Sequence, residues 1–167
     1  QALGYDQVHL YGVSYGTLLA LHVMRAYPEG LASVTLDSVA PPQINTIADQ
    51  PRVINRGLEA LFSACKADRQ CSRAYPDLKE VFYQQVDRLN AQKAPLKLTN
   101  YEDGKTYPAL LDGDTVLAVV IQMLYSTDLL PLIPRTIYQV RAGDYRVVET
   151  ILSNVVFDRS VSYGMFY

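Results

Sequence analysis

The sequence predicts a mixed α/β protein, and three observations support this fold class. Residues 1–42 contain a short apolar β-rich segment, a helical segment and a second β-rich segment, joined by short connections. Strands connected through a helix pair in parallel, with a right-handed crossover. After residue 42, apolar residues mostly recur at the helical period. Hydrophobic residues make up 49% and charged residues 19% of the 167 residues, which is typical of a globular domain rather than a disordered chain.

The N-terminal segments are expected to belong to a larger parallel sheet. Residues 8–13 and 32–37 predict two strands, and residues 17–26 predict a helix that is apolar on nearly every side and therefore packs on both faces. Parallel sheets are buried on both faces, and two strands do not meet that requirement. Together with a first residue that is Gln1 rather than Met, this predicts that the chain is an internal fragment of a longer polypeptide.

The remaining sequence predicts a mainly helical region with one small hairpin. The pattern is helical from residue 51 to residue 90, and a hairpin is expected from residue 96 to residue 108. Three further helices are expected at residues 114–125 with Asp114 as the N-cap, at residues 131–142 closed by Gly143, and at residues 144–156. We therefore predict three regions, namely a sheet core at 1–42, a helical region at 43–160 and the start of a truncated strand at 161–167.

Charge and hydropathy exclude two classes of partner. The net charge is −2 and the sequence has no run of lysine or arginine, so we expect no nucleic acid partner. The longest apolar stretch, residues 116–124, is too short to cross a bilayer, so we expect no transmembrane segment. No cofactor is expected. The acidic turns at 102–104 and 112–114 lack the ligand number of a calcium site and are interpreted as turns and a helix cap.

A G-x-S-x-G motif at Gly12-Val13-Ser14-Tyr15-Gly16 is the strongest functional signal. It lies between a predicted strand and a predicted helix, which is the context of a nucleophile elbow. In this interpretation Ser14 is the nucleophile and the backbone N–H of Tyr15 binds the oxyanion. Gly12 and Gly16 are expected because larger residues would clash where strand and helix pack closely. The alternative is a tight strand-to-helix turn that carries a small polar residue.

The chain has two histidines, and neither is expected to activate Ser14. His9 precedes Ser14 by roughly 16 Å along the strand, and His22 follows it by roughly 12 Å along the helix. Both are interpreted as packing residues. Because a catalytic histidine follows the nucleophile and acid in this architecture, we expect no catalytic aspartate or histidine within this chain. Asp37 is an alternative acid at the end of the second strand, although a cap on the following turn is favoured.

Cys65 and Cys71 lie close together in the helical region. Two cysteines without a nearby histidine do not form a zinc site, so no metal is expected. Their spacing leaves open a small disulfide or two unpaired thiols.

Three segments resemble α/β-hydrolases of the tripeptidyl-aminopeptidase and prolyl-aminopeptidase type. The segment "LGYDQVHLYGVSYGTLLALHVMRAYPEGLASVTLDSVAPP" resembles their nucleophile region, "LFSACKADRQCSRAYPDL" their cysteine-bearing helix and loop, and "MLYSTDLLPLIPRTIYQVRAGDY" their lid helices. The resemblance implies a partial α/β-hydrolase fold with residues 43–160 as an inserted lid, and a disulfide between Cys65 and Cys71. It also implies that the second oxyanion donor precedes Gln1 and that the catalytic aspartate and histidine follow Tyr167.

The leading hypothesis is therefore a fragment of a serine exopeptidase that cleaves residues from peptide N-termini through an acyl-enzyme on Ser14. Its expected partners are a peptide substrate and the remainder of the same polypeptide. The resemblance implies a secreted or envelope protein, with a cytoplasmic location as the alternative. Two other functions stay open: an esterase or lipase, and a non-catalytic binding module. The chain alone is expected to be inactive, because the acid and histidine are missing.

Overall fold

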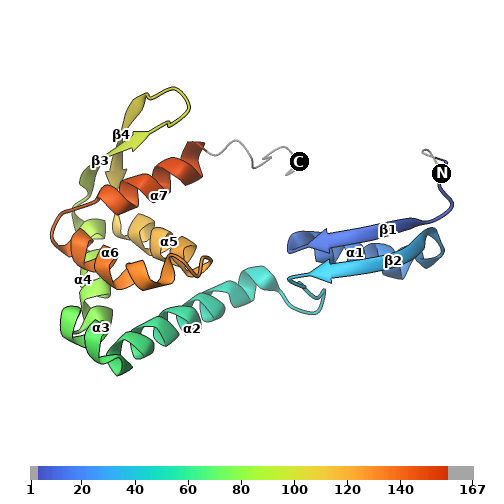
Figure 1. Cartoon of the computed structure of the whole chain (residues 1–167), viewed down its shortest axis with the longest axis horizontal. Helices are drawn as coiled ribbons and strands as arrows, with labels where there is room; N and C mark the ends of the chain where they lie inside the picture. Colours follow the sequence, from blue (N-terminus) through green and yellow to red (C-terminus); the bar gives the residue numbers. More distant parts are fainter. Residues whose placement is uncertain (1–3, 158–167) are drawn as a thin grey trace. The chain divides into compact units, whose positions relative to one another are not determined.

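The computed structural model describes residues 4–157, and the chain divides into two compact units (Figure 1). The first unit ends at Val53 and the second begins at Ile54. The combination of a parallel strand pair with many helices confirms the predicted mixed α/β class. The truncated strand predicted at 161–167 lies outside the described residues.

The first unit is a strand–helix–strand motif. Strand β1 (Val8–Val13) leads into helix α1 (Tyr15–Ala26), and a short 3-10 turn, η1 (Pro28–Gly30), leads into strand β2 (Leu31–Asp37). The two strands pair in parallel, as predicted, with Val13 opposite Asp37 at their carboxyl ends. This register places the end of β2 beside the turn that connects β1 to α1.

Helix α1 packs on the strands with one side only. Its buried residues are Thr17 and Ala20, whereas Leu19 is 61% exposed. Within the described residues the second face of the predicted helix is therefore uncovered, and its packing on both faces stays a prediction. The physical reason is that a two-stranded sheet can cover only one side of a helix, while the other apolar side chains of α1 have no facing element in this unit.

The second unit consists of helices around one core, with an antiparallel hairpin. Its elements are α2 (Thr46–Ala67, which begins before the boundary), α3 (Arg69–Ala74), α4 (Leu78–Ala91), β3 (Ala94–Thr99), β4 (Thr106–Leu111), α5 (Gly113–Leu124), η2 (Leu130–Leu132), α6 (Ile133–Arg141) and α7 (Arg146–Phe157). The pattern that is helical from residue 51 to 90 is thus divided among three helices. Fully buried side chains such as Phe82, Leu89 and Met123 form the core.

A disulfide joins the end of α2 to α3. Cys65 and Cys71 are bonded, with their Cα atoms 5.1 Å apart, so the pairing implied by the family resemblance is present. Asp68 lies between them and caps α3 by accepting hydrogen bonds from the N–H groups of Gln70 and Cys71. The bond therefore closes a tight helix–turn–helix corner.

Helix α7 covers the outer edge of strand β3. Glu149 accepts a hydrogen bond from the Lys97 N–H at 2.9 Å, and Ser153 accepts one from the Thr99 N–H at 2.9 Å. Residues four apart lie on one face of a helix and alternate residues of a strand share an edge, so the two spacings match. Figure 1 shows α7 running beside the hairpin. The donors of this edge are satisfied by side chains instead of by a third strand.

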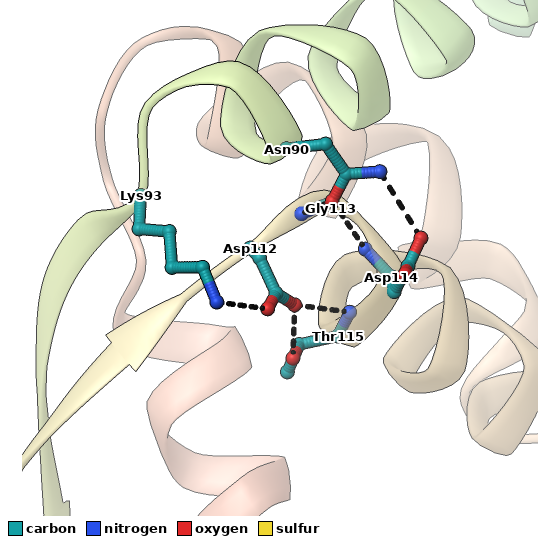
Figure 2. Close-up of polar contacts among 6 residues, drawn as sticks. All are labelled: Asn90, Lys93, Asp112, Gly113, Asp114 and Thr115. Atoms are coloured by element: carbon teal, nitrogen blue, oxygen red, sulfur yellow. Dashed lines mark hydrogen bonds and ion pairs between the residues drawn. The ribbon is translucent and has the colours of Figure 1, made fainter.

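The N-cap of α5 is Asp112 rather than the predicted Asp114. The Asp112 carboxylate accepts hydrogen bonds from the N–H and hydroxyl of Thr115 and forms an ion pair with Lys93 at 2.9 Å (Figure 2). The Thr115 hydroxyl, followed by Lys93, lowers the pKa of Asp112 well below its usual range. Asp114 lies in the first turn of the helix. The acidic turn at 112–114 does cap a helix, as expected, but through Asp112.

The first residue of α5 lies against helix α4 with no space for a side chain. A Cβ atom on Gly113 would lie 1.9 Å from the backbone oxygen of Val86. Asn90, also on α4, holds the same turn by accepting hydrogen bonds from the N–H groups of Gly113 and Asp114 (Figure 2). Glycine at position 113 is therefore required for the close approach of α4 and α5.

The last two helices begin later than predicted. Residues 130–132 form the 3-10 turn η2, and α6 starts at Ile133. Gly143 has a positive φ of 78°, as expected for a residue that ends a helix. Asp144 precedes α7, where it accepts a hydrogen bond from the N–H of Arg146 and binds the guanidinium group of the same residue. Arg146 lowers the pKa of Asp144 to about 2.

Candidate active site

Ser14 lies at the turn between β1 and α1 in a strained backbone conformation. Its φ is 53° and its ψ is −119°. A residue other than glycine seldom adopts a positive φ, and such strain persists only where surrounding contacts enforce it. The residue is exposed, so the turn presents the hydroxyl to solvent. This is the geometry expected of a nucleophile elbow, here defined as residues 12–16.

Hydrogen bonds hold the backbone of Ser14 on both sides. The Ser14 N–H donates to the backbone oxygen of Asp37, the last residue of β2, at 2.9 Å. The Ser14 carbonyl accepts from the Thr17 N–H at 3.0 Å and from the Thr17 hydroxyl at 2.6 Å. The unusual conformation is thus fixed by β2 on one side and by the first turn of α1 on the other.

The two elbow glycines differ in how much space the structure leaves for a side chain. A Cβ atom on Gly12 would lie 2.6 Å from the backbone oxygen of Gly16, so strand and helix require glycine at position 12. A Cβ atom on Gly16 would meet nothing within 4 Å. The expectation that a side chain at Gly16 would clash is therefore wrong for the described residues. The crowding is between a side chain at position 12 and the Gly16 backbone, and it does not involve a side chain at position 16.

The first turn of α1 offers a place for negative charge beside Ser14. Tyr15 is the first residue of the helix, so its N–H has no acceptor within the helix. The helix dipole adds partial positive charge at the same end. The Tyr15 side chain is 76% exposed and therefore does not fill this space with a packed ring. An oxyanion formed next to Ser14 could accept a hydrogen bond from this backbone group.

Comparison with known families agrees with this geometry. A family model described as the alpha/beta hydrolase fold matches residues 1–105. The chain belongs to the α/β-hydrolase fold family. No curated protein and no solved structure matches the sequence. The family match extends past the elbow into the helical unit, and it does not distinguish peptidases from esterases.

In an α/β-hydrolase the serine is activated by a histidine, and the structure places both histidines of this chain away from that role. His9, near the start of β1, hydrogen-bonds through Nδ1 to the hydroxyl of Ser33 on β2 at 2.7 Å. His22 lies in the middle of α1. Both are exposed, so their interpretation as packing residues is wrong: the outer surfaces of this unit are not covered in the described part of the chain.

Asp37 is tied to neighbouring hydroxyl groups. Its Oδ2 accepts a hydrogen bond from the Tyr11 hydroxyl at 2.9 Å, and its Oδ1 accepts one from the Ser38 hydroxyl at 3.1 Å. The bond to Asp37 raises the pKa of Tyr11. Asp37 was expected to cap the following turn, and its side chain instead makes a contact from β2 to Tyr11 on β1. In this arrangement the carboxylate braces the ends of β1 and β2 beside the elbow.

Thr17 is the site residue that the sequence reasoning missed. It is fully buried, at 0% exposure, although it is a polar residue in a helix that the sequence predicts to be apolar on nearly every side. Besides its bond to Ser14, its hydroxyl oxygen accepts a hydrogen bond from the Ala40 N–H at 2.8 Å. A signal was present, since a polar residue directly after the elbow on an otherwise apolar helix needs a partner when buried.

Proposed function

We propose that Ser14 is the nucleophile of a serine hydrolase that removes residues from peptide N-termini. The observation that supports this proposal most directly is the exposed Ser14 at φ 53°, fixed between β1 and α1. The Ser14 Oγ attacks the scissile carbonyl carbon, and the oxyanion accepts a hydrogen bond from the Tyr15 N–H. Collapse of the tetrahedral intermediate expels the protonated amine and leaves an ester on Ser14, which water then hydrolyses.

Within the described residues, no side chain is placed to take the proton of Ser14 in this reaction. Neither His9 nor His22 is placed for it, and the Asp37 carboxylate binds hydroxyl groups. We therefore infer that the catalytic histidine and aspartate belong to the remainder of the same polypeptide. The exposed apolar side chains of the first unit, such as Val13 and Leu19, support further elements packing there.

The peptidase assignment is supported by the resemblance to tripeptidyl- and prolyl-aminopeptidases. The Cys65–Cys71 disulfide matches the pairing that this resemblance implies. Residues 43–160 would then be the inserted lid region that the same resemblance implies. Disulfides persist in oxidising compartments, so we propose a secreted or envelope location. Within the described residues, no helix is long and apolar enough to cross a membrane.

The test uses the protein produced from its complete gene and a fluorophosphonate probe, which forms a covalent bond with activated serines. We expect labelling of the wild type and none of Ser14→Ala. Ser38→Ala is the matched control, because Ser38 is an exposed serine beside the site that also has a positive φ, of 58°. It should keep the label. A wild type that is not labelled, or a Ser14→Ala variant that is, would contradict the proposal.

Substrate class is tested with the same protein. A tripeptide anilide with a free N-terminus, its N-acetylated form and a p-nitrophenyl ester are compared. Cleavage of the free peptide alone is expected of an exopeptidase that recognises the N-terminus. Cleavage of the ester alone would indicate an esterase, and binding without turnover of any of the three would indicate a non-catalytic module.

A further inference from the structure

The hydroxyl group of Thr17 connects three parts of the first unit. It donates a hydrogen bond to the Ser14 carbonyl at 2.6 Å and accepts one from the Ala40 N–H at 2.8 Å. Ala40 lies just after β2, in the segment that leads toward α2. Thr17 therefore links the strained residue of the elbow to a segment 23 positions further along the chain.

Both bonding functions of this hydroxyl are used, and the side chain is completely buried. A hydroxyl has one proton to donate, and here that proton goes to Ser14, while an oxygen lone pair receives the Ala40 N–H. Valine has nearly the same shape but neither function, so it would leave a carbonyl and an N–H without this partner. Serine keeps both functions and lacks only the methyl group.

We propose that Thr17 is a positioning residue for Ser14: its hydroxyl locks the elbow to the segment after β2 and so fixes the direction of the Ser14 Oγ. This inference rests on the proposed function of Ser14. The Ser14 N–H is already held by Asp37 at 2.9 Å. The Ser14 carbonyl accepts both the Thr17 N–H at 3.0 Å and the Thr17 hydroxyl at 2.6 Å, and only the hydroxyl also connects this carbonyl to Ala40.

The experiment compares Thr17→Val with Thr17→Ser in the protein produced from its complete gene. The matched control is Thr136→Val, because Thr136 on α6 is also buried, at 2% exposure, and also donates its hydroxyl to a carbonyl, that of Leu132 at 3.0 Å. The measured quantity is the second-order rate constant of labelling by a fluorophosphonate. A displaced nucleophile reacts more slowly, so we expect a loss on the order of tenfold to a hundredfold for Thr17→Val. Thr17→Ser and Thr136→Val should stay near the wild-type rate.

A second readout reports the connection without any chemistry at Ser14. Hydrogen–deuterium exchange is followed by mass spectrometry on peptides that contain Ala40. We expect faster exchange in Thr17→Val and near wild-type exchange in Thr17→Ser, because only the serine can still accept from the Ala40 N–H. If Thr17→Val does not fold, Thr17→Ser still decides: slow labelling together with fast exchange in that variant would show that the methyl group, not the hydroxyl, holds the elbow.

The two proposals fail in different ways. A wild type that is not labelled overturns the function of Ser14, while the exchange of Ala40 still tests the connection through Thr17. Wild-type labelling of Thr17→Val, or an equal loss in Thr136→Val, overturns the positioning role and leaves the nucleophile assignment intact.

Discussion

The contact of α5 with α4 gives a prediction whose size can be worked out from the structure. In Gly113→Ala the new Cβ would lie 1.9 Å from the Val86 oxygen and 2.6 Å from the Val86 carbonyl carbon. The two helices would have to separate by roughly 1 Å or more to reach ordinary van der Waals contact. The Asn90 side chain resists this movement, because it bonds to the Gly113 N–H at 2.8 Å.

Two effects set the change in the free energy of unfolding of Gly113→Ala. Overpacking lowers it, and the intrinsic preference of alanine for helices partly offsets this loss. Overpacking a tight contact costs about 3 kcal/mol at the upper end of its usual range. Alanine recovers about 0.5–1 kcal/mol relative to glycine in a helix. We therefore expect Gly113→Ala to lower the free energy of unfolding by about 2–2.5 kcal/mol.

Gly57→Ala is the matched control, since Gly57 lies inside α2 and its added Cβ would meet only the Leu124 side chain, at 3.5 Å. That variant should gain about 0.5–1 kcal/mol. Both are measured by urea denaturation followed by circular dichroism, comparing midpoints at an unchanged slope. Equal stability of Gly113→Ala and wild type would refute the argument from the close contact.

Two further predictions follow from local geometry. Gly12→Ala should destabilise the protein by about 1–3 kcal/mol because of the 2.6 Å contact with the Gly16 oxygen, whereas Gly16→Ala should be neutral or slightly stabilising; equal effects in urea denaturation would contradict the distinction. Arg146 lowers the pKa of Asp144 in the folded protein to about 2 from an ordinary value of 3.8. The contact of Asp144 with Arg146 therefore stabilises the folded protein fully above about pH 4, and this stabilisation is lost as the pH falls toward 2. Asp144→Asn should flatten the pH dependence of stability in that window, and an unchanged acid slope would count against the Arg146 contact.

The sequence was most informative where the decisive contacts are local. The two strands of the first unit were predicted within one residue, because short apolar β-rich segments bounded by turns leave few alternatives. The prediction of Asp114 as the N-cap was wrong, because Asp112 and Asp114 both precede the same apolar helical pattern and the pattern alone does not distinguish them. Tertiary neighbours decide it, since Lys93 binds one carboxylate and Asn90 binds the other.

The same distinction explains which parts of the site were found. The elbow was predicted because Gly12, Ser14 and the start of α1 are adjacent in sequence. Thr17 was missed because its role depends on the Ala40 N–H, which β2 brings to it from 23 residues away. The difference between Gly12 and Gly16 also depends on packing, because a Cβ at position 12 points at the backbone of α1 whereas a Cβ at position 16 meets no atom within 4 Å.

These contacts imply that the two requirements of the proposed chemistry are physically separate. The direction of the Ser14 hydroxyl is set inside one strand–helix–strand unit, by Asp37 on the N–H side and Thr17 on the carbonyl side. Proton transfer instead needs a base within hydrogen-bond reach of Oγ, and His9 is bonded to Ser33 while His22 lies in the middle of α1. A change at Thr17 should therefore alter how fast Ser14 reacts without moving the pH at which its base titrates. A change in the base should do the reverse, so a pH–rate profile of Thr17→Val that is lowered but not shifted is the signature that separates orientation from activation.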